Sequence, residues 1–118
     1  MSREQQKEQL DAVIKLSRTL PPGEAKECVQ KFKEYTFMQL THDNFESFQK
    51  QANGQSWGNI DYDTFIQEYM FPETKHLPAE EAKQRNVETL VAQYFQHQPD
   101  DVIAALNIDP EMLAHSRS

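Results

Sequence analysis

The chain has 118 residues, the usual size of one domain, which leaves too little sequence for a second independent core. Nineteen acidic residues against 12 basic ones give a net charge of −7, which argues against nonspecific binding to nucleic-acid phosphates. Only 37% of the residues are apolar, but seven Phe, four Tyr and one Trp are more aromatic residues than a disordered chain carries.

The first third of the chain predicts two helices. Apolar residues recur at intervals of three and four over residues 10–20, so we expect an amphipathic helix over about residues 3–19. The Pro-Pro-Gly at 21–23 ends this helix, and proline also suits the first turn of the next one. Phe37 and Met38 point away from the apolar stripe of the second helix, so this helix either is buried on two sides there or ends near residue 35. The stripe consists of Ala25, Cys28, Val29, Phe32 and Tyr35.

The middle of the chain predicts two further short helices. Asp43 followed by Glu46 fits a capping box, in which each side chain accepts a hydrogen bond from the backbone N–H of the other residue. A third helix is therefore expected to begin near residue 43. The glycines and polar residues at 53–58 predict a loop, and Asp61 or Asp63 can cap a fourth helix.

The last third predicts one long helix and two short ones. Pro78 and the acids after it open a fifth helix, whose apolar stripe continues to Phe95. Pro99 separates it from a short sixth helix that extends through Leu106. Asp109, followed by proline, is typical of a cap and a first turn for a final helical segment.

These patterns together predict a compact all-α bundle of six or seven helices, several of them short, in a single domain that spans residues 1–118. No sustained alternation of apolar and polar residues indicates a strand. The residues expected to share one core are Val13, Ile14, Val29, Phe32, Phe45, Phe48, Phe65, Tyr69, Val87, Leu90, Val91, Phe95, Ile103 and Leu106.

Residues 40–70 place two predicted helices around a loop of about 12 residues, and this segment resembles an EF-hand. With Asn53 at the first loop position, Gly58 falls at the sixth, where an EF-hand has glycine for a sharp turn. The ligand positions are degenerate, because Trp57 stands at the fifth and Thr64 at the twelfth, where the family has a bidentate acid. The resemblance implies an EF-hand-like domain that has lost calcium binding.

Residues 101–114 resemble a helix-turn-helix, with a turn at Asn107 between two short helices. This motif implies a DNA-binding transcriptional regulator. Asp109 and Glu111 on the second helix would repel phosphates, and Arg117 alone supplies too little positive charge. A plain helical corner fits these residues better, and we expect no nucleic-acid partner.

The sequence offers no set of residues from which an active site could be assembled. Cys28, the single cysteine, lies on an apolar helix stripe, where we expect a buried structural thiol rather than a nucleophile. His42 with Glu46, and Glu111 with His115, have the spacing of two ligands on one helix face, but no His-Glu-x-x-His segment accompanies them. We predict no enzymatic activity, no cofactor and no metal site.

No feature of the sequence predicts a membrane anchor or an export signal. No apolar run reaches the roughly 20 residues that a membrane-spanning helix needs. The first residues also lack the apolar core of a signal peptide. We expect a cytoplasmic protein with no membrane partner.

Trp57 and the run of Tyr69, Met70 and Phe71 are the candidate partner-binding residues, because aromatic residues are enriched at interface hot spots. The alternative for Trp57 is that its indole folds back over the neighbouring aromatic residues. The expected function is that of a small acidic, non-catalytic protein-interaction module, such as an adaptor, an inhibitor or an immunity-type protein, whose partner has a basic surface. The same aromatic residues could instead be buried against a second copy in a homo-oligomer.

Overall fold

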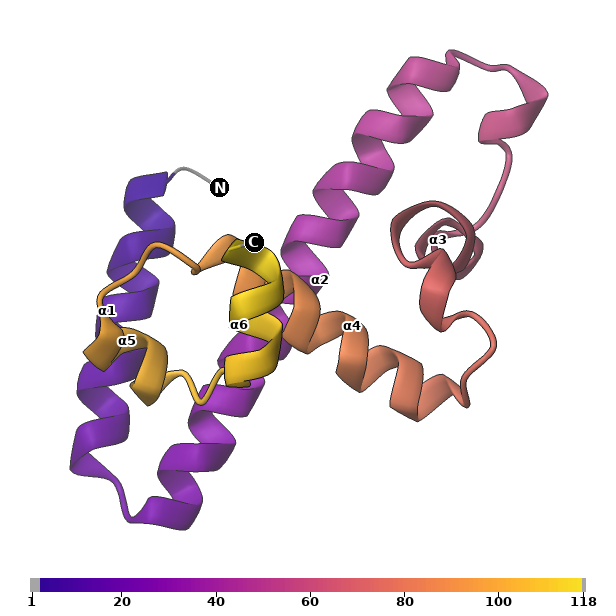
Figure 1. Ribbon diagram of the computed structural model, residues 1–118. Helices are drawn as coiled ribbons and strands as arrows, with labels where there is room; N and C mark the ends of the chain where they lie inside the picture. Colours follow the sequence, from indigo (N-terminus) through magenta and orange to yellow (C-terminus); the bar gives the residue numbers. More distant parts are fainter. Residues whose placement is uncertain (1–2, 118) are drawn as a thin grey trace.

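The computed structural model describes the backbone of residues 3–117 and the side chains of residues 4–114, and this part of the chain forms six α-helices and no strand (Figure 1). The all-α fold class predicted from the sequence is confirmed. The helices are α1 (Arg3–Thr19), α2 (Pro22–Ala52), α3 (Tyr62–Phe65), α4 (Ala79–Tyr94), α5 (Asp100–Ala105) and α6 (Pro110–Arg117). Three single turns complete the fold, namely the 3-10 turns η1 (Ser56–Gly58) and η3 (Pro72–Thr74) and the π-helical turn η2 (Ile66–Met70). None of the described helices combines the length and the apolar character needed to cross a bilayer.

The helix α2 runs without a break over 31 residues, so the predicted start of a new helix at Asp43 is wrong. Asp43 and Glu46 both lie on the exposed side of this continuous helix, and Glu46 pairs with Lys50 at 3.3 Å. The capping-box pattern arises here from surface residues that happen to have the required spacing.

The continuity of α2 follows from a stripe of side chains that runs along its whole second half. Its residues are three or four positions apart and are Lys33, Phe37, Thr41, Phe45, Phe48 and Ala52. Lys33 and Thr41 are polar, so the hydropathy of the sequence hides the stripe although both side chains are buried. Phe37 therefore lies on the inward side of the helix, while Met38 beside it is exposed.

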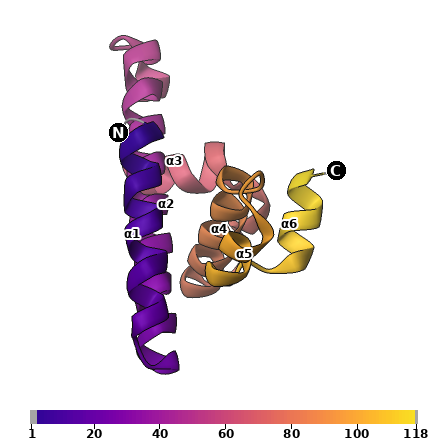
Figure 2. The same cartoon turned by 90° about the vertical axis from the view of Figure 1, so that its left-hand side faces the viewer.

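The body of the protein consists of α1, the first half of α2, α4, α5 and α6. In Figure 2, α1 and α2 form one layer, α4 and α5 lie against that layer, and α6 lies on the outer side of α4. The buried residues of the body core are Leu10, Ile14, Val29, Phe32, Phe37, Phe71, Val87, Val91, Ala92, Phe95, Ile103, Leu106 and Ile108.

A buried ion pair holds three segments of the body together. The side chain of Lys33 on α2 is only 2% exposed, and its Nζ lies 2.6 Å from a carboxylate oxygen of Glu88 on α4. The same ammonium group donates a hydrogen bond of 3.3 Å to the backbone carbonyl of Asn107, which has a φ of 55° in the turn between α5 and α6. The two oxygen partners satisfy a charge that would otherwise be costly to bury.

The predicted helical corner near the C-terminus is present between α5 and α6, and its second helix packs against the body. Asp109 accepts a hydrogen bond of 2.9 Å from the backbone N–H of Glu111, as expected of a cap. Met112 and Leu113 on α6 pack against the body core. His115, which the sequence paired with Glu111, lies outside the residues whose side chains the structure describes.

The second half of α2 projects from the body, and the chain folds back along it (Figure 1). We call residues 41–74 the arm; the molecule extends 49 Å along its longest axis and about 30 Å along the others. Phe71 joins the arm to the body, because its ring packs on Phe37 with 5.9 Å between the centroids. The hydroxyl of Thr74 donates a buried hydrogen bond of 2.8 Å to Asn86 on α4 and fixes the same end of the arm.

The predicted single core is therefore divided into a body core and an arm cluster. Phe65 is buried, and Phe45 and Phe48 are half-buried, but the rings of Phe45 and Phe48 both pack on Phe65 in the arm and are not part of the body core. Tyr69 is 54% exposed, so its predicted place in the core is wrong. The other predicted core residues are buried in the body core or, like Val13 and Leu90, packed against it.

The turn at the tip of the arm depends on a close approach between two backbone segments. Asn53 (φ 48°) and Gly54 (φ 85°) take left-handed conformations that end α2. Gly58 then passes so near α2 that a Cβ atom on it would lie 2.2 Å from the Cβ atom of Ala52.

We expect Gly58→Ala to destabilise the protein by about 1–3 kcal/mol, since the added methyl group overlaps a buried neighbour that cannot rotate away. Urea unfolding followed by the fluorescence of Trp57, the single tryptophan, measures this loss. Gly23→Ala is the matched control, because a Cβ atom there meets nothing within 4 Å. Equal stability of the two variants would contradict the close approach.

Candidate functional site

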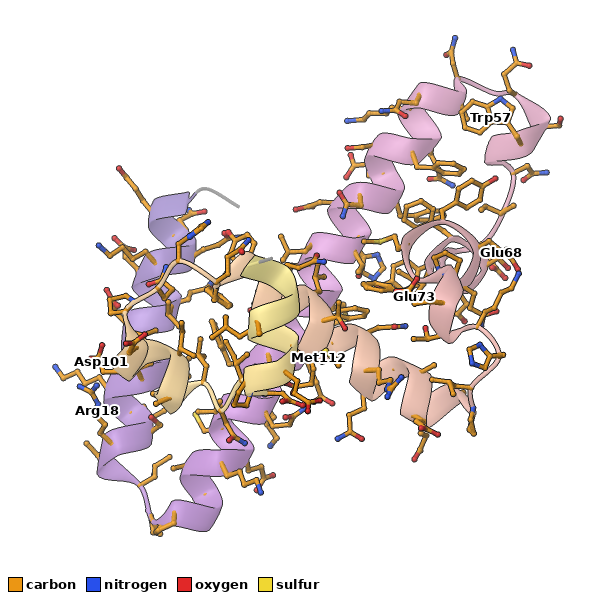
Figure 3. All side chains as sticks on the ribbon, in the orientation of Figure 1. Arg18, Trp57, Glu68, Glu73, Asp101 and Met112 are labelled. Carbon is orange, nitrogen blue, oxygen red and sulfur yellow. The ribbon has the colours of Figure 1, made fainter. Side chains whose placement is uncertain are left out.

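Aromatic side chains form a continuous cluster along the arm, between α2 and the segment that folds back on it (Figure 3). Phe48 is its centre: its ring centroid lies 5.3 Å from Trp57, 4.9 Å from Phe65 and 4.8 Å from Tyr69. Trp57 packs edge-on against Phe48 but remains 47% exposed. The indole thus has one side against the cluster and one side in solvent.

The α3 segment is fixed to α2 by polar contacts as well as by rings. The hydroxyls of Thr41 and Tyr62 are hydrogen-bonded to each other, and the Tyr62 ring stacks on His42 with 4.1 Å between the centroids. Of the two predicted caps, Asp61 and Asp63, it is Asp61 that caps α3. Its carboxylate accepts a hydrogen bond of 2.7 Å from the backbone N–H of Thr64. The hydroxyl and the backbone N–H of Thr64 together lower the pKa of the Asp61 carboxyl below its usual value.

The π-helical turn η2 decides which of the predicted partner-binding residues face solvent. The N–H of Phe71 donates to the carbonyl of Ile66, five residues earlier, over 2.8 Å. This wider turn brings Ile66 and Phe71 to the side of the body, while Phe65 and Tyr69, four residues apart, lie against Phe48. Such turns occur frequently at functional sites.

The four predicted partner-binding residues thus separate into two groups. Trp57 and Tyr69 are exposed and both contact Phe48. Met70 is half-buried against the body core, and Phe71 is buried in it at 5% exposure. The anchor role expected of Phe71 is therefore corrected: its ring is part of the packing between the arm and the body and is not available to a partner.

Most of the net negative charge of the chain lies on the arm. The arm has six acidic residues and one lysine, a net charge of −5 out of the −7 of the whole chain. Glu68 and Glu73 lie along the arm, while the exposed ion pair of Arg18 with Asp101 lies at the opposite end of the molecule (Figure 3). The six acids are Asp43, Glu46, Asp61, Asp63, Glu68 and Glu73.

A groove of about 750 Å³ lies on the inner side of the arm, between α2 and the segment from α3 to α4. Its apolar lining residues include Phe37 and Met38 of α2, Ile66 of η2, Leu77 just before α4 and Ala82 in α4. The sequence alone does not reveal this groove, because its walls come from elements that are up to about 50 residues apart. The only local signal was Met38, an apolar residue directed away from the stripe of its own helix.

The remaining candidate residues from the sequence are scattered. Cys28 is half-buried. His42 stacks on Tyr62, and Glu46 pairs with Lys50 rather than with His42. Among the residues whose side chains are described, no three His, Cys, Asp or Glu side chains are grouped so that they could hold a metal ion. The EF-hand resemblance of residues 40–70 remains a prediction from the sequence.

Comparison of the chain with models of protein families, with curated proteins and with solved structures gave no match.

Proposed function

We propose that this protein is a protein-interaction module that binds a basic segment of a partner protein with the tip of its arm. The observation that carries the proposal is the pair of exposed aromatic residues, Trp57 and Tyr69, on a segment with a net charge of −5. Aromatic residues are enriched among the residues that dominate binding energy, and their rings also attract cations.

The packing behind these two rings supports the same function. Trp57 and Tyr69 both rest on Phe48, so their side chains are partly ordered before a partner arrives. Ordering a side chain in advance reduces the entropy that binding would otherwise cost. The acidic groups of the arm attract a basic partner during the approach, and they repel an acidic one.

The test is affinity capture from the native cell extract, followed by binding measurements with the purified partner. We expect Trp57→Ala to weaken binding of the captured partner by about 30-fold or more, which corresponds to a hot spot of about 2 kcal/mol. Raising the salt concentration should slow association, because the attraction of the arm is screened. Circular dichroism verifies that the variant keeps its helices.

Leu16→Ala is the matched control, since Leu16 is an equally exposed apolar residue (51%) on α1, outside the arm. It should bind the partner as the wild type does. Full retention of the partner by Trp57→Ala would refute the proposed site. Capture of the protein alone, together with a dimer in sedimentation that Trp57→Ala dissociates, would replace the proposal with self-association.

A further inference from the structure

We propose that the groove between α2 and α4 binds a small amphipathic anion, that is, a molecule with an apolar chain or ring system and one acidic head group. This site is separate from the exposed pair of Trp57 and Tyr69, neither of which lines the groove. The inference therefore goes beyond the proposed protein-binding function and does not depend on it.

The dimensions of the groove fit a small molecule. Its volume of about 750 Å³ lies within the range of pockets that hold small ligands, roughly 300–1,000 Å³. In Figure 1, α4 comes together with α2 at its C-terminal end, and α3 with its neighbouring turns lies beside the space between the two helices.

The groove has an apolar floor. Phe37 and Ile66 lie at the junction of the arm with the body, and Leu77 covers the side next to α4. Met38 leaves its flexible thioether chain about half exposed over this floor. Methionine side chains adapt to ligands of different shape, so the floor can accommodate an alkyl chain as well as a ring.

The charge of the groove is opposite to that of the rest of the molecule. Three lysines line it, Lys31 on the α2 side and Lys75 and Lys83 on the side leading into α4. Two acids, Glu34 and Asp63, line it as well. The lining therefore has a net charge of +1, although the remainder of the chain carries −8. This contrast favours an acidic head group.

The lysines of the groove can turn to a ligand without loss of a buried contact. Lys31 pairs with Glu27 at 3.3 Å and Lys75 with Glu68 at 3.5 Å, but all four side chains are at least half exposed, and such pairs contribute little to stability. Lys83 has no ion-pair partner among the described residues. Of the six acids of the arm, only Asp63 lines the groove, and charges more than about 8 Å away are largely screened at physiological salt.

The experiment compares three ligands that share one alkyl chain: decanoate, decanol and decyltrimethylammonium. Binding is followed by the NMR signals of the methionine methyl groups, in which Met38 reports on the groove and Met112, on α6, serves as an internal reference. We expect decanoate to shift the Met38 signal in a saturable way and to leave Met112 unchanged. Decanol should bind at least about tenfold more weakly, and the cation more weakly still.

Two variants locate the head group. Lys83→Gln should lower the affinity for decanoate about tenfold, because it removes the lysine without an ion-pair partner. Lys15→Gln, on the exposed side of α1, should leave it unchanged, and so should Trp57→Ala. A failure of the protein-binding proposal is thus distinguishable from a failure of this one.

Three results would overturn the inference. The first is the absence of a Met38 shift at about 1 mM decanoate, a concentration at which even weak specific ligands bind. The second is equal affinity for decanoate and for the cation, which would mean that the lysines do not select the head group. The third is equal loss of affinity in Lys83→Gln and Lys15→Gln, which would reflect only the overall charge.

Discussion

Replacement of the buried lysine, Lys33→Ala, is expected to destabilise the protein by about 3–5 kcal/mol and to lower the Tm by at least about 10 °C. The substitution leaves the carboxylate of Glu88 without its partner at 2.6 Å and removes the hydrogen bond to the carbonyl of Asn107. It also leaves a cavity where α2, α4 and the turn before α6 meet. Urea unfolding followed by circular dichroism measures the change in the free energy of unfolding.

Lys50→Ala is the matched control, because Lys50 lies on the same helix and also pairs with an acid, Glu46, but is 77% exposed. Its loss should change the stability by less than about 1 kcal/mol. A joint replacement of Lys33 by Met and Glu88 by Leu should recover much of the loss, since apolar residues of similar size often substitute for a buried ion pair. Similar effects of Lys33→Ala and Lys50→Ala would show that the burial of Lys33 contributes nothing.

The second large effect concerns Phe71, which the sequence suggested as a partner-binding residue and which the structure places in the body core. Phe71→Ala should cost about 3–5 kcal/mol of stability, because it removes a ring that is 5% exposed and packs on Phe37. Its neighbour Tyr69 is 54% exposed, so Tyr69→Ala should cost no more than about 1.5 kcal/mol through lost contacts with Phe48 and Phe65.

Substitutions at the two positions should also differ in their effect on binding. Tyr69→Ala should weaken the complex with the partner captured by the wild type, while Phe71→Leu, which keeps an apolar side chain in the core, should bind that partner normally. Urea unfolding measures the stabilities, and titration with the purified partner measures the affinities. A smaller loss of stability in Phe71→Ala than in Tyr69→Ala would contradict the inward position of Phe71.

The parts of this fold that follow from neighbouring residues could be predicted from the sequence. The prolines at 21–22 separate α1 from α2, and Asp61 and Asp109 cap the helices that follow them. Caps and proline breaks act within one turn of a helix, so they need no information about the rest of the chain. The loop that contains Trp57 also follows from local information, namely the glycines and polar residues at 53–58. The exposure of Tyr69 does not, because the sequence also placed this residue in the core and the structure leaves it 54% exposed.

The tertiary structure alone decided the features that depend on distant partners. Thr41 and Lys33 can continue the buried stripe of α2 because each has a polar partner. The hydroxyl of Thr41 is hydrogen-bonded to that of Tyr62, and Lys33 forms an ion pair with Glu88. The carbonyl that Lys33 also binds is 74 residues away, so hydropathy along one helix cannot reveal that this lysine is buried. Similarly, no pattern of residues predicts the π-helical turn that directs Phe71 inward. The turn is defined by the backbone hydrogen bond from the N–H of Phe71 to the carbonyl of Ile66.

The sequence by itself thus determined the helical class, most of the helix ends and the excess of negative charge. The tertiary structure decided where that charge and the large side chains act. It made the segment 41–74, which holds five of the seven net negative charges, a projecting arm, divided the aromatic residues between two cores, and formed a lysine-lined groove between α2 and α4. The physical reason is the distance along the chain over which each interaction acts. Capping and helix propensity act over a few residues, whereas burial and charge complementarity depend on which segments fold against each other.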